Sequence, residues 1–242
     1  MDTIKIKKKK VKMIAHRGLS GLEKENTCPA FVAAGNRSYF GIETDVHRSA
    51  DGKYVVFHDE TTDRVSNNAC SINIEESNYA DYSNLTLPDV DGTTNRRDTV
   101  IPQLIDYIKI CKKYDKFCVL ELKNRFELEY TKEIVEIIKS ENYLDKMIYI
   151  SFNFENCVDL RKLLPNAHIQ WLTSGVIDNE QIAKLVEHNF YLDINYKSID
   201  KATIKKLHSH GLTVNVWTCN DKEIAEKLVK MGVDYITTNI LE

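Results

Sequence analysis

The sequence predicts a closed (β/α)8 barrel. Short apolar segments alternate with amphipathic helical patterns along most of the chain, and eight such apolar segments can be counted. Strands that alternate with helices favour a parallel sheet with crossover helices, and eight repeated units in 242 residues are typical of the closed barrel. An open, doubly wound sheet is the alternative, but no glycine-rich phosphate loop follows the first strand.

The predicted strands are short runs of mostly apolar residues, and they start near Val11, Gly41, Phe117, Met147, Ile169, Tyr191, Thr213 and Val233. Apolar residues at three- and four-residue intervals predict helices between them. One helix opens near Glu25, one runs from Pro102 to about Tyr114, and others cover Tyr130–Ser140, Cys157–Leu164, Asn179–His188, Ile199–His210 and Asp221–Met231. The chain stops shortly after the last strand, so we expect the eighth helix to be missing or vestigial.

Residues 60–99 break this rhythm. The stretch is rich in Asn, Ser, Thr and Asp, and it follows a short hairpin strand that the Asp51-Gly52 turn signal joins to the second strand. It is longer than ordinary loops, which predicts a small folded insertion. This insertion has two possible roles: it forms a wall or lid over a pocket, or it is a surface insertion without a function in the site. The whole chain, residues 1–242, is then one barrel domain with one insertion.

Composition is ordinary for a soluble globular protein, with 43% hydrophobic and 29% charged residues. The net charge of -3 argues against a nucleic-acid partner, and nothing in the sequence implies a protein partner. The six cysteines form no C-x-x-C pair, which favours free thiols. We expect a cytoplasmic protein without stable membrane insertion. No stretch is long and apolar enough to span a bilayer, and the N-terminus lacks the apolar core of a signal peptide. A secreted form whose signal has been removed is the alternative.

Acidic residues mark the second strand. Glu43 and Asp45 lie two positions apart and therefore face the same side of an extended strand. Glu121 ends another apolar run and shares its face with Lys123. Two or three carboxylates that meet in one place repel one another, and oxygen ligands of this kind suit a divalent cation, Mg²⁺ or Ca²⁺. Surface acids and a Glu121–Lys123 surface ion pair are the structural alternatives.

Further polar residues fall at or near the ends of predicted strands, where barrel enzymes place their chemistry. They are His16, Arg17, His58, Ser151 and Trp217, in addition to the acids. Random placement would scatter such residues along strands and helices. The convergence indicates an active site.

Several of these residues belong to motifs that resemble a known family in order and spacing. The motifs are His16-Arg17-Gly18, Glu25-Asn26-Thr27, Glu43-Thr44-Asp45-Val46, Asp51-Gly52, His58-Asp59, Asp63-Arg64, Glu121-Leu122-Lys123, Ser151-Phe152 and Trp217-Thr218-Cys219-Asn220. Together they resemble the glycerophosphodiester phosphodiesterase family over essentially the whole chain. One departure is the Thr238-Asn239-Ile240-Leu241 end, where the family usually has Thr-Asp-x-Pro.

The resemblance implies metal-dependent hydrolysis of a small-molecule glycerophosphodiester to glycerol phosphate and an alcohol. The substrate's own glycerol hydroxyl would attack, and water would then open a cyclic phosphate. We assign Glu43, Asp45 and Glu121 to the metal, and His16 and His58 to acid–base catalysis, since histidine holds either protonation state near neutral pH.

Arg17 and Lys123 would balance the phosphate charge. Trp217, Asn26 and Ser151 complete the expected substrate-binding set, although capping the first helix is the default use of an Asn at the position of Asn26. Two other functions remain open: lysophospholipase D-type action on a lipid phosphodiester, and a barrel that binds a phosphorylated ligand without turnover.

Overall fold

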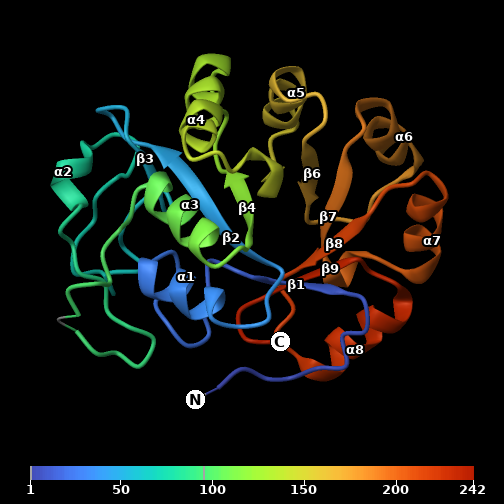
Figure 1. Cartoon of the computed structure of the whole chain (residues 1–242), viewed down its shortest axis with the longest axis horizontal. Helices are drawn as coiled ribbons and strands as arrows, with labels where there is room; N and C mark the ends of the chain where they lie inside the picture. The colour runs from blue at the N-terminus through green and yellow to red at the C-terminus, as the bar shows by residue number, and fades with distance from the viewer. Residues whose placement is uncertain (1, 95) are drawn as a thin grey trace.

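A computed structural model describes residues 2–94 and 96–242. Eight parallel strands close into a barrel (Figure 1): they follow one another in the order β1-β9-β8-β7-β6-β5-β4-β2, and β2 pairs with β1. Their bounds are β1 Lys12–Ala15, β2 Gly41–Arg48, β4 Phe117–Leu122, β5 Met147–Ser151, β6 His168–Thr173, β7 Tyr191–Asn195, β8 Val214–Trp217 and β9 Tyr235–Thr238. The predicted (β/α)8 barrel is confirmed, and each predicted strand start lies within about two residues of the observed one.

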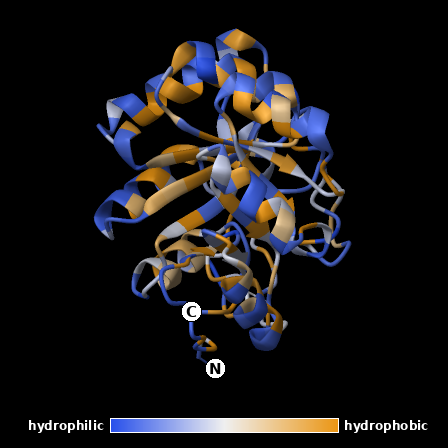
Figure 2. Ribbon diagram, turned by 90° about the vertical axis from the view of Figure 1, so that its right-hand side faces the viewer, coloured by the Kyte–Doolittle hydropathy of each residue, from blue (hydrophilic) through white to orange (hydrophobic). Residues whose placement is uncertain are grey.

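Helices surround the strands. They are α1 Cys28–Gly35, α3 Leu104–Lys113, α4 Leu128–Ser140, α5 Phe154–Leu163, α6 Asn179–His188, α7 Lys201–Ser209 and α8 Lys222–Met231, with short turns α2 Tyr79–Tyr82, η1 Leu144–Lys146 and η2 Tyr196–Ser198. Their apolar sides pack on the sheet, and their hydrophilic residues, blue in Figure 2, lie mostly on the outside. No helix follows β9 in the described chain, as predicted.

The helix starts follow local chemistry. Asp178, Asp200 and Asp221 each precede a helix and accept a hydrogen bond from a backbone N–H of its first turn. The first helix begins at Cys28, three residues later than expected from Glu25, and Pro29 occupies its first turn. Within the described residues, no helix has the length and apolar character that a bilayer span requires.

Two apolar layers stabilise the barrel. A large cluster lies between the strands and the surrounding helices. A smaller one fills the barrel itself and consists of Ile14, Val119, Ile148, Ile150, Leu172 and Tyr235. Because successive strand residues alternate between these layers, a polar residue that replaces an inward-facing apolar one projects into the barrel interior.

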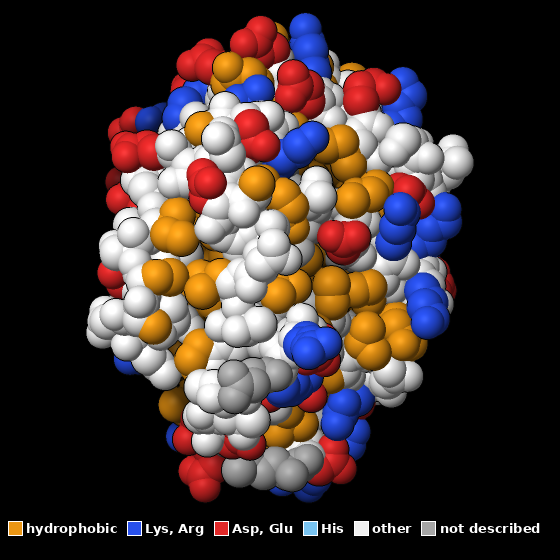
Figure 3. All heavy atoms as spheres, turned by 90° about the vertical axis from the view of Figure 1, so that its left-hand side faces the viewer, with side chains coloured by type: hydrophobic (Ala, Val, Ile, Leu, Met, Phe, Trp, Pro, Cys, Tyr) orange, Lys and Arg blue, Asp and Glu red, His pale blue; other side chains and the backbone are white. Residues whose placement is uncertain are grey.

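The hairpin strand β3, Tyr54–Val56, pairs antiparallel with β2 after the predicted turn. The segment 60–99 that follows has its own apolar cluster with β3 and its neighbours: Val55, Phe57, Val65, Ile74, Tyr82, Leu87 and Ile101. It is therefore folded rather than bare coil. On the face that carries α2, apolar side chains lie among charged ones (Figure 3). The segment is held to the β1–α1 loop, where Lys24 Nζ donates to the Val65 carbonyl at 2.9 Å.

The turn after β1 depends on a glycine. Gly18 has φ +77°, and a Cβ there would lie 2.7 Å from the backbone carbon of Ala30. We expect Gly18→Ala to lower the free energy of unfolding by about 2–4 kcal/mol, the sum of left-handed strain and overpacking. Urea denaturation measures this. Gly211→Ala is a matched control, since Gly211 has φ +76° and open space, and its cost should be only about 1 kcal/mol. Equal costs would contradict the steric argument.

Candidate active site

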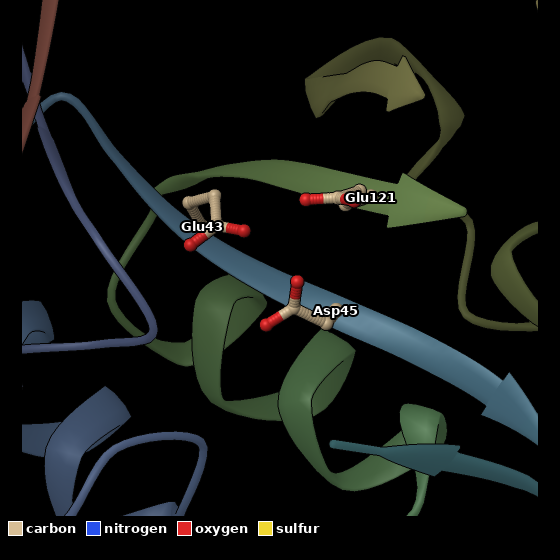
Figure 4. A group of neighbouring side chains, drawn as sticks. All are labelled: Glu43, Asp45 and Glu121. Carbon is tan, nitrogen blue, oxygen red and sulfur yellow. The ribbon is translucent and has the colours of Figure 1, made fainter. Parts of the chain in front are cut away.

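Three carboxylates converge at the carboxyl end of the barrel. Glu43 and Asp45 project from the same face of β2, and Asp45 lies directly beside Glu121 in the parallel register of β2 and β4. Their nearest ligand oxygens are all within 4.8 Å of one another (Figure 4). All three residues are buried, with exposed fractions of 2%, 1% and 7%. The structure thus brings together the three acids that the sequence analysis assigned to a metal.

Two cations face this cluster. Lys123 Nζ lies 2.9 Å from Glu121 Oε1 and 3.6 Å from Asp45 Oδ1, and Arg17 Nε lies 3.6 Å from Asp45 Oδ2. Burial would raise the pKa of Asp45, but Arg17 and Lys123 outweigh it and lower that pKa. Burial and the Asp45 charge raise the pKa of Glu121 to about 7 and that of Glu43 well above its usual range. The two cations therefore do not fully neutralise the cluster.

The cluster fits a hard divalent cation. Among the described residues, Asp45 Oδ1 is a buried oxygen without a hydrogen-bond partner, and its nearest cation, Lys123 Nζ, is 3.6 Å away. Such atoms are costly unless a cation or a donor reaches them. Three carboxylates offer the oxygen ligands that Mg²⁺ and Ca²⁺ prefer. The residues present are thus able to hold such an ion.

The two predicted catalytic histidines border the same cavity. His16 Nδ1 lies 2.8 Å from Asn239 Oδ1, and His58 Nδ1 lies 2.6 Å from Asp59 Oδ1. Because both partners accept, each Nδ1 carries the proton, and each neutral ring keeps Nε2 as an acceptor. Burial and the Arg17 charge lower the pKa of His16 to about 4; burial also lowers the pKa of His58. Asn239 stands at the position where the chain departs from the family pattern.

An ion-pair network holds Arg17 and His58 in place. Arg17 Nη1 donates to Glu25 Oε1 at 2.8 Å, and its backbone N–H donates to Glu43 Oε2 at 2.8 Å. Arg64 donates two hydrogen bonds to Glu25, at 2.8 and 2.9 Å, and a third from Nε to Asp59 Oδ2 at 2.7 Å. One guanidinium therefore joins the carboxylate beside Arg17 to the carboxylate beside His58.

Most of the charged residues that line the cavity come from β2 and β4 or follow β1 and β3, and its apolar residues come from β5, β6 and β8 or directly follow them. Its lining residues are His16, Arg17, Glu43, His58, Glu121, Ile150, Phe152, Leu172, Asp193, Trp217, Thr218 and Thr237. The Trp217 ring stands edge-on to Phe152, with centroids 5.6 Å apart. The sequence analysis did not single out Asp193. The signal that would have found it is a lone acid within the apolar run of β7.

Two predicted substrate-binding residues lie behind the cavity wall. Asn26 does not cap α1, whose N-cap is Thr27; its amide donates to Asp45 Oδ2 at 2.8 Å and its oxygen accepts from Thr44. Ser151 is fully buried and donates to the Leu122 carbonyl at 2.7 Å. Contrary to the expectation of substrate contact, both side chains are engaged in internal hydrogen bonds that hold neighbouring strands and Asp45 in place.

His47 also supports the site from behind. It is buried in β2, with Nδ1 2.8 Å from Glu75 Oε1 and Nε2 3.2 Å from the His58 carbonyl oxygen. Because Nε2 can donate to that carbonyl, His47 fixes the backbone that carries the His58 ring.

Comparison with known proteins places these features in a family. The family model described as "Glycerophosphoryl diester phosphodiesterase family" matches residues 16–242. The chain belongs to this family. A glycerophosphodiester phosphodiesterase of Caldanaerobacter subterraneus subsp. tengcongensis is 30% identical over 241 residues, which cover 95% of this chain and 94% of that protein. The predicted family and the predicted enzyme class are thereby confirmed.

Solved structures agree with this assignment. The Oleispira antarctica phosphodiesterase, in complex with the product sn-glycerol-3-phosphate, superposes with a TM-score of 0.84 at 26% identity, covering 94% of this chain and 92% of that one. A glycerophosphodiester phosphodiesterase from Parabacteroides distasonis gives a TM-score of 0.77 at 28% identity, covering 99% and 94%. Both structures therefore share the fold of this family member.

Cation binding to the acidic cluster should depend on pH. A cation binds the ionised carboxylates, and Glu121, with a pKa raised by burial to about 7, is protonated below that pH. Affinity for Ca²⁺ or Mg²⁺ is expected to be roughly 30-fold weaker at pH 5.5 than at pH 8, with proton release on binding. Isothermal titration calorimetry in buffers of different ionisation enthalpy measures both quantities. An affinity that stays constant between the two pH values would contradict the raised pKa.

Proposed function

We propose that the protein hydrolyses glycerophosphodiesters to glycerol phosphate and an alcohol, with a divalent cation, Mg²⁺ or Ca²⁺, held by Glu43, Asp45 and Glu121. The observation that supports this most directly is the cluster of three buried carboxylates, two of which, Glu43 and Glu121, line the same cavity as both histidines. Such a cation would polarise the phosphoryl oxygens and lower the pKa of a bound hydroxyl group.

Charge compensation comes from this chain's own cations. Arg17 lines the cavity and offers a planar set of donors that matches a phosphate, while Lys123 adds a point charge beside Glu121. The pKa of Arg17 stays raised despite burial because Asp45, Glu25 and Glu43 surround it. Its charge is therefore permanent at any working pH.

His16 and His58 move the protons. One neutral ring accepts the proton of the attacking glycerol hydroxyl at Nε2, and the other ring, which must enter this step as the imidazolium, gives its Nε2 proton to the leaving alcohol oxygen. The roles reverse when water opens the cyclic phosphate. Asp59 accepts from His58 Nδ1 and stabilises the imidazolium whenever His58 is charged, whereas the Asn239 amide gives His16 no such charge.

A lipid phosphodiester is the second candidate substrate. It is favoured by Phe152, which lines the cavity, is 44% exposed and stands against Trp217. This apolar rim is suited to an acyl chain or to a choline group.

Turnover of glycerophosphocholine and of lysophosphatidylcholine by the purified protein with Mg²⁺ or Ca²⁺ separates the two candidates. We expect kcat/KM to favour glycerophosphocholine. A preference for lysophosphatidylcholine would make a lipid phosphodiester the substrate. If neither compound is turned over but a phosphorylated ligand still binds, the protein is a binding barrel without this activity.

A further inference from the structure

A single acid stands inside the barrel on β7. Leu192 and Ile194 pack outward in the large apolar cluster, so Asp193, between them, faces the interior. Asp193 is 1% exposed and lines the cavity. An ionisable group at such a position is costly to bury, which indicates a role for it.

Asp193 lies across the barrel from the acidic cluster. Four strand-to-strand steps separate β7 from β2 in either direction around the eight-stranded ring. The cavity therefore has Glu43 and Glu121 on one wall and Asp193 on the opposite wall. On the β5 and β6 side of Asp193, the cavity residues Ile150, Phe152 and Leu172 are apolar.

One oxygen of Asp193 is fixed and the other is free. Asn215 Nδ2 donates to Asp193 Oδ2 at 3.0 Å, and Asn215 itself lies within 3.3 Å of Gln170 Oε1 and of the Thr237 hydroxyl. Within residues 2–94 and 96–242, Asp193 Oδ1 has no hydrogen-bond partner although it is buried. The carboxyl group is thus held rigidly with one polar atom unused.

The protonation state suits a neutral ligand. Burial, assisted by the Glu121 charge, raises the pKa of Asp193 well above its usual range. A neutral carboxyl group both donates and accepts a hydrogen bond, as an alcohol hydroxyl does. An anionic phosphate gains less from this group than from Arg17 on the other wall.

We propose that Asp193 binds the terminal hydroxyl of the glycerol moiety and makes the site selective for glycerol. This inference rests on the proposed function. The phosphate and the adjacent hydroxyl belong near the cations and the acidic cluster, so the far end of the three-carbon chain points to the opposite wall. Asp193 Oδ1 is the polar atom there that needs a partner. A site that pairs a substrate hydroxyl rejects an analogue that lacks it, because the buried polar atom is then left unpaired.

The test compares glycerophosphocholine with 2-hydroxypropyl phosphocholine. The analogue lacks the terminal hydroxyl and keeps the hydroxyl that attacks phosphorus. We expect wild-type kcat/KM to favour glycerophosphocholine by roughly 30-fold or more. In Asp193→Ala the preference should fall to within about threefold, mainly through loss of activity on glycerophosphocholine. The variant Asp193→Leu, nearly the same shape but without a hydrogen-bonding group, provides the same comparison if the alanine variant does not fold, with the preference again expected to fall to within about threefold.

Two controls separate binding from structural support. Leu172→Ala enlarges the same wall without removing a hydrogen-bonding group, so it should change both rates alike and keep the preference. Calorimetric Ca²⁺ affinity should be unchanged in Asp193→Leu. A wild-type preference that persists in both Asp193 variants would overturn the inference and leave the proposed function intact. A wild-type protein that turns over neither compound would overturn both.

Discussion

Replacing His58 with alanine is expected to lower kcat/KM for glycerophosphocholine by roughly 10²–10⁴-fold, the usual contribution of a positioned acid or base. The His58 ring is only partly buried and its Nδ1 is held by Asp59. Its removal should therefore change the free energy of unfolding by no more than about 1 kcal/mol. Steady-state kinetics and urea denaturation measure the two effects.

Two variants sharpen this test. His210→Ala removes an exposed histidine at the end of α7 and should leave kcat/KM unchanged. Asp59→Asn keeps the His58 ring but removes the carboxylate at its Nδ1, so the loss should be smaller and the pH profile should shift. Activity within threefold of wild type in a folded His58→Ala protein would remove this ring from the mechanism.

Removal of divalent cations by EDTA should lower kcat/KM about 10³-fold, because a Lewis-acid cation stabilises a phosphoryl transition state by several kcal/mol. Added Mg²⁺ or Ca²⁺ should restore it. Asp45→Asn should weaken cation binding and activity together, because Asp45 lies between Glu43 on its own strand and Glu121 on the next.

The alternative is that Lys123 alone balances the acids. Its Nζ already lies against Glu121 and Asp45, and its pKa is raised despite burial by the same two charges. Under this alternative EDTA would have no effect, and calorimetry would detect no Ca²⁺ or Mg²⁺ binding. Hydrolysis that is insensitive to EDTA would therefore rule out the metal assignment.

The sequence was sufficient for the barrel and for the residues at its strand ends. Alternation along Gly41–Arg48 put Glu43 and Asp45 on one face, and the same reasoning for Phe117–Leu122 added Glu121. These predictions depend on local geometry, which a strand transmits reliably over a few residues. The position of α1 was less predictable, because Asn26 adopts a left-handed conformation, φ 55°, that turns its amide to Asp45 instead of starting a helix.

The sequence analysis named Arg64, His16 and Asn239 but did not predict which residues they contact. Arg64 belongs to the segment 60–99, and its two carboxylate partners are 39 and five residues away. The hydrogen bond between His16 and Asn239 spans 223 residues. Nothing in the local pattern around such residues fixes their partners, since closure of the barrel creates the contact. Asp193 differs, because its strand alternation alone directs it inward.

Arg64 belongs to the segment 60–99 and hydrogen-bonds both Glu25 and Asp59. Catalysis therefore depends on this segment staying folded. The apolar packing of this segment is the small cluster around Ile74 and Tyr82, which is separate from the main apolar layers. The segment is therefore expected to open before the barrel does on heating. Once it opens, Arg17 and His58 both lose a support, so thermal inactivation should precede global unfolding, and the working temperature limit of the enzyme should lie below the melting temperature of its barrel.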